Sequence, residues 1–159
     1  MAEKYQVSHH PVEYFISLIK SGSIAIPEIQ RPFIWKPRQV RDLIDSLYTG
    51  YPTDYLIISQ SPDMKLRDGS TSEGKKILID GQQRVTALMT SIAGYEIVDS
   101  ELERKRIKIS FNPFAGEEED VFKVQDNAIL KDKKWIKDIA DIFNEAIDEI
   151  VADLEGGAL

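Results

Sequence analysis

The stretch Ile77–Arg84, which reads ILIDGQQR, decides how the middle of this chain folds. Its three leading apolar residues are typical of a buried strand. Gly81 follows directly after Asp80, and a glycine can take the unusual φ that a tight corner needs. From Gln82 onward the chain reads QQRVTALMTSIAG, and its apolar residues recur at helical spacing. The stretch therefore predicts a buried strand, a corner at Gly81 and a helix.

The segments on either side of this stretch alternate irregularly between helix and strand patterns. Gly22 and Gly50 can end the two helices that precede it. An irregular alternation of this kind is typical of an α+β fold. In chain order the predicted elements are a helix at 10–22, a strand at 23–27, a helix at 38–50, strands at 55–59 and 77–80, a helix at 82–94, strands at 106–111 and 120–124, and a helix from 135 to 154.

The composition narrows the class of protein. The chain of 159 residues has no cysteine, which excludes disulfides and thiolate zinc sites. Its two histidines, His9 and His10, are adjacent, so we expect no histidine-based nuclease site in this chain. No apolar run approaches the ~20 residues of a membrane span, and we expect a cytoplasmic protein without a membrane partner.

The net charge of −7 is unevenly distributed. Residues 1–96 are neutral, whereas residues 97–159 carry 16 acids against 9 bases. Global acidity argues against broad, nonspecific binding to nucleic acid. We interpret the chain as a domain over residues 1–134 and an acidic C-terminal helix over residues 135–159. That helix either starts a further helical region or closes the domain as a surface helix.

The corner after the strand offers groups that suit an anion. A helix that starts there exposes unpaired backbone N–H groups and the positive end of its dipole, a combination that binds phosphate. Gln82 and Gln83 offer further donors, and Arg84 can bind a phosphate through two N–H groups. Asp80 can hold Mg²⁺, orient a water molecule or cap the helix. More often, however, an Asp-Gly pair before a helix is only a cap and a turn, and such an arginine is a solvated charge.

A second polar group precedes the helix at 38–50. Pro32 and Pro37 keep this segment extended or turned. Arg31, with Gln30 beside it, can bind a phosphate, and Trp35 can stack on a base. Core packing is an equally good interpretation of Trp35. Three basic residues can form a DNA-binding strip near the predicted phosphate site, and we expect this strip to bind DNA weakly in isolation. They are Lys36, Arg38 and Arg41.

Taken together, two motifs resemble one known family. They are IPEIQRPFIWKPRQVRDLIDSLYTGYPTDYLIIS at 26–59 and ILIDGQQRVTALMTSI at 77–92. In order, in spacing and in the helix that follows each, they resemble the N-terminal domain of GmrSD-type, modification-dependent restriction endonucleases. The resemblance runs from about Val7 to Gly94 and continues more loosely through RIKISFNPF at 106–114 and VFKV…KKWIKDI at 121–139. It implies a ParB/sulfiredoxin-like fold, in which helices flank a mixed sheet and a helical segment lies at the C-terminus.

The resemblance also implies a function for the two motifs. It implies that they bind and hydrolyse a nucleoside triphosphate, GTP among the substrates, and so control a nuclease that acts on modified or phage DNA. Mg²⁺ is the expected cofactor, and Asp80 is its expected ligand. The expected catalytic residues are Asp80, Gln83, Arg84 and Arg31. The expected nucleotide-binding residues are Gln30, Arg31, Trp35, Gly81, Gln82, Gln83 and Arg84.

The nuclease of this family usually lies in a C-terminal His-Asn-His domain, and no such motif occurs in this chain. We therefore expect a fragment, a split subunit or a stand-alone homologue with a separate nuclease partner, and no DNA cleavage by this chain alone. The alternative function is a binding module that senses a nucleotide or a DNA feature without turnover. A purely structural oligomerisation unit ranks last, because it leaves the charged corner without a purpose.

Overall fold

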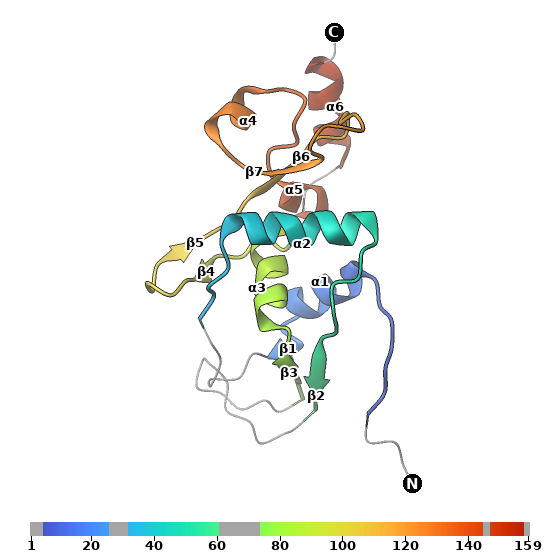
Figure 1. The fold of residues 1–159 in the computed structure, drawn as a ribbon, viewed down its shortest axis with the longest axis vertical. Helices are drawn as coiled ribbons and strands as arrows, with labels where there is room; N and C mark the ends of the chain where they lie inside the picture. Colours follow the sequence, from blue (N-terminus) through green and yellow to red (C-terminus); the bar gives the residue numbers. More distant parts are fainter. Residues whose placement is uncertain (1–4, 26–31, 61–73, 145–146, 158–159) are drawn as a thin grey trace.

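The computed structural model describes residues 5–25, 32–60, 74–144 and 147–157. The fold is α+β, as predicted, and its helices and small sheets alternate along the chain (Figure 1). In chain order the elements are α1 Val12–Lys20, β1 Ile24–Ala25, α2 Pro37–Thr49, β2 Ile57–Ser59, β3 Lys76–Asp80, α3 Gln82–Ser91, β4 Ile97–Val98, β5 Arg104–Lys105, β6 Ile109–Phe111, β7 Phe122–Val124, α4 Asn127–Lys131, α5 Ile139–Asn144 and α6 Ile147–Gly157.

The strand predicted from ILID is β3, the central strand of a three-stranded sheet with the order β1-β3-β2. β1 runs parallel to β3, and β2 runs antiparallel to it. Ile77 and Leu78 are completely buried, whereas Ile79 and Asp80 are exposed. The strand therefore leaves the core just before the corner, which brings the polar residues of the motif to the surface of the sheet.

The predicted helix after the corner is α3, which runs from the end of β3 toward α2 (Figure 1). α2 lies across the far end of α3, and α1 packs beside α3. The apolar faces predicted from helical spacing meet in one core. Its fully or nearly buried members include Val40 and Leu43 from α2, Leu78 from β3, and Val85 and Leu88 from α3.

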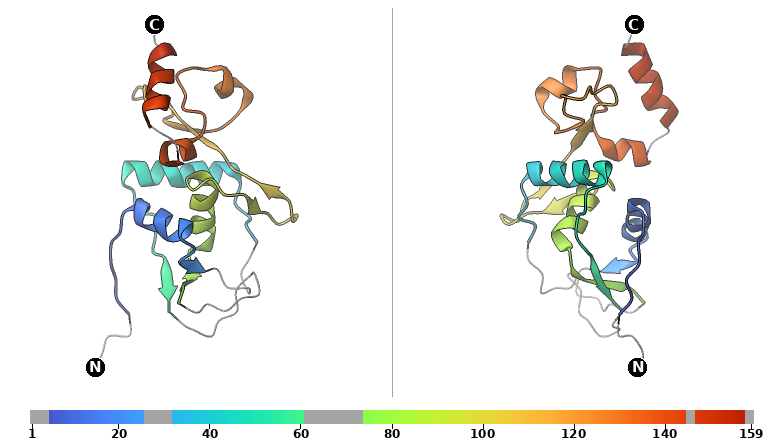
Figure 2. Two further views of the ribbon diagram at one scale, coloured as in Figure 1. Left: turned by 180° about the vertical axis from the view of Figure 1, so that it is seen from behind. Right: turned by 45° about the vertical axis from the view of Figure 1, so that its right-hand side comes forward.

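The C-terminal elements lie on the opposite side of α2 from the central sheet (Figure 2). β6 and β7 lie within the two strands predicted at 106–111 and 120–124, and they form an antiparallel pair with Ile109 opposite Val124. α2 packs against β7, and Phe122 from β7 and Ile139 from α5 belong to the same core cluster as the residues of α3. α2 is thus covered on both sides. The division of the chain at residue 134 stays a prediction.

The helix predicted to begin at residue 135 is wrong at its start, because α5 begins only at Ile139. Ile136 instead pairs with Phe111 through both of its backbone groups, at 2.8 and 3.0 Å. Asp138 ends this extended segment, because its Oδ1 accepts a hydrogen bond from Ala140 N at 3.1 Å and so satisfies a donor of the first helical turn. Backbone pairing with a distant strand thus overrides the local helical pattern.

Candidate functional site

Gly81 forms the predicted corner between β3 and α3. Its φ is +94°, in the left-handed region, and its carbonyl accepts a hydrogen bond from Val85 N at 3.0 Å. The residue is buried, and a Cβ there would overlap Leu56 Cδ2 and lie 3.1 Å from Arg84 Nη2. The need for glycine is therefore confirmed. The close neighbours of this position are side chains of the same protein, Leu56 and Arg84.

Asp80 lies exposed at the end of β3. The N-cap of α3 is Gly81, which has no side chain, so helix capping is excluded among the three roles predicted for Asp80. Asp80 is also absent from the lining of the cavity described below. Its exposed carboxylate is compatible with the two other predicted roles, holding Mg²⁺ and orienting water.

The amides of the two glutamines hold the backbone of the chain. Gln82 Nε2 donates to Ile79 O at 2.9 Å, across the corner. Gln83 reaches a distant segment, where its Oε1 accepts from Ile34 N and its Nε2 donates to Pro32 O, both at 3.0 Å. Neither side chain lines the cavity described below. Both glutamines therefore lie at the predicted corner, and their side-chain amides hydrogen-bond to backbone groups of the chain.

The guanidinium of Arg84 holds the loop between α2 and β2. Its Nη1 donates to Thr53 O at 2.8 Å and its Nη2 donates to Tyr55 O at 2.7 Å. Asp54, between these two residues, has a φ of +76° and places a carboxylate oxygen 3.4 Å from Nη1. The side chain of Arg84 is 17% exposed, and that of Asp54 is 79% exposed. A nearly buried positive charge thus faces an acidic partner that lies in water.

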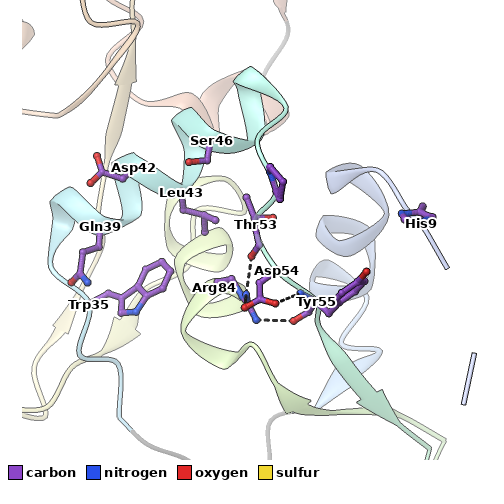
Figure 3. Close-up of a pocket in the computed structure, with 11 residues that line it drawn as sticks. His9, Trp35, Gln39, Asp42, Leu43, Ser46, Thr53, Asp54, Tyr55 and Arg84 are labelled. Atoms are coloured by element: carbon purple, nitrogen blue, oxygen red, sulfur yellow. Dashed lines mark hydrogen bonds and ion pairs between the residues drawn. The ribbon is translucent and has the colours of Figure 1, made fainter. Parts of the chain in front are cut away.

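Arg84 lines a cavity of about 890 Å³. Its walls come from the segment before α1, from α2 and Trp35 in the segment before it, from the loop between α2 and β2, and from the first turn of α3 (Figure 3). Small-molecule sites typically have volumes of about 300 to 1,000 Å³, so the cavity can hold a nucleotide-sized ligand. The lining residues are His9, Trp35, Gln39, Asp42, Leu43, Ser46, Pro52, Thr53, Asp54, Tyr55 and Arg84.

Core packing, one of the two interpretations of Trp35, is confirmed, whereas stacking on a base stays a prediction. Trp35 is half-buried and packs against the core, and its side chain also lines the cavity. In Figure 3 it lies on one side of Arg84, and Thr53 and Tyr55 lie on the other. Phe33, two residues earlier, is 3% exposed, whereas Ile34 between them is 59% exposed. Alternate side chains of this segment therefore face inward, as in an extended chain.

The three bases predicted to bind DNA lie at the start of α2. Lys36 and Arg38 are exposed. Arg41 is half-buried and its Nε lies 2.7 Å from Asp42 Oδ1, so an acid of the same helix already neutralises it. None of the three lines the cavity. The structure thus leaves two of the three predicted bases open to a phosphate backbone.

Two of the predicted site residues, Gln30 and Arg31, lie outside the described residues. Of the described ones, Trp35 and Arg84 meet in the cavity. The wall formed by Thr53–Tyr55 was not predicted from the sequence, because this segment carries no cluster of charged residues. The available signal was Pro-Thr-Asp directly before a strand, since proline and aspartate favour turns and aspartate tolerates a positive φ.

Within the described residues, one group of three carboxylates has oxygen atoms within 4.8 Å of one another: Asp99, Glu101 and Glu103. Asp99 already accepts hydrogen bonds from the backbone N of both glutamates and pairs with Lys105 Nζ at 2.8 Å. The Lys105 hydrogen bond holds the pKa of Asp99 below its usual range. This group does not include Asp80.

Comparison with known protein families identifies a family to which this chain belongs. The model of the GmrSD restriction endonuclease N-terminal domain matches residues 12–155, which include both motifs and the C-terminal elements as far as α6. No curated protein and no solved structure matches the chain, so the ParB/sulfiredoxin likeness stays a prediction. Among the described helices, none is both long and apolar enough to cross a membrane.

Proposed function

Because the chain belongs to the family of GmrSD restriction endonuclease N-terminal domains, and is thus a component of a restriction system with a nuclease domain as partner, we propose that it binds a nucleoside triphosphate. The nucleotide occupies the cavity beside Arg84, and its binding controls the partner nuclease. One observation carries this proposal. A single cavity joins Arg84 from the corner motif to Trp35 from the second motif (Figure 3).

Arg84 is well prepared to bind a phosphate. Its two hydrogen bonds to backbone carbonyls fix the plane of the guanidinium, and each terminal nitrogen keeps a second N–H. Asp54 is exposed and 3.4 Å away, so a phosphate can replace it without leaving a buried acid unpaired. A guanidinium held in this way can donate two parallel hydrogen bonds to phosphate oxygens.

The wall around Trp35 is suited to the nucleoside. A half-buried indole offers a stacking surface to any base, and such stacking contributes about 1 to 3 kcal/mol per base. Gln39, Asp42 and Ser46 line the same cavity and offer donors and acceptors to a ribose or a base edge. The cavity therefore combines the guanidinium of Arg84 for a phosphate with the indole of Trp35 for a base.

Hydrolysis of the bound triphosphate is the next part of the proposal. Phosphoryl transfer requires positioning and charge stabilisation, and it needs no nucleophilic side chain. Arg84 stabilises the charge that develops on the transferred group, and Asp80 at the same corner holds Mg²⁺ or orients the attacking water. Gln83 and Arg31 are the other predicted catalytic residues. Mg²⁺ bound with the triphosphate supplies positive charge that neutralises the phosphates.

Binding without turnover is the second candidate, and one observation favours it. Of the described residues of the corner motif, Arg84 lines the cavity, while Gln82 and Gln83 use their amides to hold backbone. In this case the domain senses a nucleotide, or a DNA feature that passes the exposed Lys36 and Arg38, and signals to the nuclease.

Replacing Trp35 with alanine is expected to weaken nucleotide binding about tenfold or more, because a stacked base loses its aromatic surface. Calorimetric titration with a nonhydrolysable GTP analogue and Mg²⁺ measures the change. Phe114→Ala is the matched control, since Phe114 is 57% exposed and does not line the cavity. Equal affinities of the two variants would show that the indole does not contact the ligand.

Phosphate release from GTP, ATP or CTP with Mg²⁺ separates the two candidates. If the domain hydrolyses the nucleotide, Arg84→Ala and Asp80→Ala are expected to slow release on the order of 100-fold, because each removes charge stabilisation from the transferred group. Glu13→Ala, an exposed acid of α1, is expected to leave the rate unchanged. If wild type shows nucleotide-dependent thermal stabilisation without phosphate release, the domain binds without turnover.

A further inference from the structure

Gln83 and Arg84 are adjacent residues, and they hold two different walls of the cavity. We infer that Gln83 is a positioning residue, which fixes the segment that carries Trp35 and so sets the position of the indole. The part of this inference that concerns ligand affinity rests on the proposed nucleotide-binding function. The part that concerns the position of Trp35 stands on the contacts of Gln83 alone.

The contacts of Gln83 imitate those of a neighbouring strand. Its Oε1 accepts from Ile34 N and its Nε2 donates to Pro32 O, so one amide pairs with the two backbone groups that flank Phe33. Both distances are 3.0 Å, well within the range of N–H···O hydrogen bonds. Because the amide carries one donor side and one acceptor side, it fixes both the position and the direction of this segment.

The segment needs such a clamp, because its own sequence limits backbone pairing. Pro32 and Pro37 have no N–H to donate, and the pairing of the segment with other strands is a single bridge from Phe33 to Asp99 within the described residues. Phe33 is 3% exposed and anchors the segment in the core. Two residues later Trp35 faces the same side, where it lines the cavity.

Arg84 fixes the wall of the cavity that is formed by the loop between α2 and β2. Its guanidinium holds Thr53 O and Tyr55 O, which flank Asp54 as the contacts of Gln83 flank Phe33. Successive residues of a helix point about 100° apart, so neighbours in the first turn of α3 can reach two separate segments. The first turn of α3 thus sets the distance between the indole of Trp35 and the guanidinium of Arg84. Gln82 takes no part in this, because its amide is bound to Ile79 O.

Gln83→Glu tests the inference, because it keeps the shape of the side chain and replaces the N–H donor with an oxygen that faces Pro32 O. Gln125→Glu is the matched control, since Gln125 does not line the cavity and its Nε2 also donates to a backbone carbonyl, Lys137 O at 2.9 Å. Both are made with Trp135→Phe, so that Trp35 is the one remaining tryptophan. The readouts are Trp35 emission, its quenching by acrylamide, and the affinity for a nonhydrolysable GTP analogue with Mg²⁺.

In the Gln83→Glu variant we expect Trp35 emission at longer wavelength, stronger quenching and about tenfold weaker nucleotide binding, and in the Gln125→Glu variant we expect no such changes. Equal Trp35 emission and quenching in the two variants would overturn the inference. If Gln83→Glu prevents folding, Gln83→Met provides the same test, because it keeps the length and removes both hydrogen bonds without a charge. If wild type binds no nucleotide while Gln83 still controls Trp35, the proposed function fails and the positioning role stands.

Discussion

Replacing Gly81 with alanine is expected to destabilise the protein by about 3 kcal/mol, through two costs that add at one position. The φ of +94° places an alanine in the left-handed region, which disfavours residues that have a Cβ. That Cβ would also overlap Leu56 Cδ2 and crowd Arg84 Nη2 at 3.1 Å, so the packing around the corner must shift. Displacement of Arg84 would disturb the cavity as well.

Urea denaturation of matched glycine variants measures this cost. Gly50→Ala is the control, because Gly50 has a similar φ of +77° and open space where its Cβ would lie. We expect Gly50→Ala to lower the free energy of unfolding by only about 1 kcal/mol, which is the cost of a Cβ in the left-handed region. Leu56→Ala combined with Gly81→Ala is expected to lose less than the sum of the two single changes, since it removes the overlapping atom. Equal losses for Gly81→Ala and Gly50→Ala would refute the packing argument.

The second large effect is expected at Asp138, whose replacement by alanine should also cost about 3 kcal/mol. Its side chain is 6% exposed and its Oδ2 lies 2.9 Å from Arg106 Nη1. Arg106 in turn donates to Thr90 O near the end of α3, so this pair links α3 to the start of α5. Removal of the carboxylate leaves the guanidinium with a positive charge that has lost its partner in a largely buried site, and leaves Ala140 N without its acceptor.

Asp120→Ala is the matched control for this pair. Asp120 lies 3.6 Å from Lys123, and both side chains are about half exposed, so its loss is expected to cost less than about 1 kcal/mol. Denaturation midpoints of the two variants, compared at one pH and one salt concentration, provide the measurement. If Asp138→Ala is no less stable than Asp120→Ala, the buried pair does not hold α5 to α3.

The elements closest to ILIDGQQR could be predicted from the sequence, because their signals are local. An apolar run, a glycine and a helical period lie within residues 77–92, and the structure has β3, the corner and α3 there. The start of α5 could not be predicted in this way. The backbone of Ile136 pairs with Phe111, 25 residues earlier in the chain, and no local sequence pattern predicts such a pairing.

The use of the polar residues in the corner also depends on distant partners. Gln83 and Arg84 were predicted to donate hydrogen bonds to a phosphate, and in the structure both donate to backbone carbonyls. The partners of Gln83 are backbone groups of Ile34 and Pro32, 49 and 51 residues away, and those of Arg84 are backbone groups of Thr53 and Tyr55, 31 and 29 residues away. A sequence motif states which side chains offer hydrogen bonds, whereas the fold decides whether ligand or backbone receives them. Trp35 illustrates the same point, because its side chain packs against the core and also lines the cavity.

A crystal structure of the domain with a nonhydrolysable GTP analogue and Mg²⁺ tests the nucleotide cavity most directly. We predict that the phosphates contact the guanidinium of Arg84 and that the base lies against the indole of Trp35. An analogue bound elsewhere on the protein, with the cavity beside Arg84 free of nucleotide, would contradict this account.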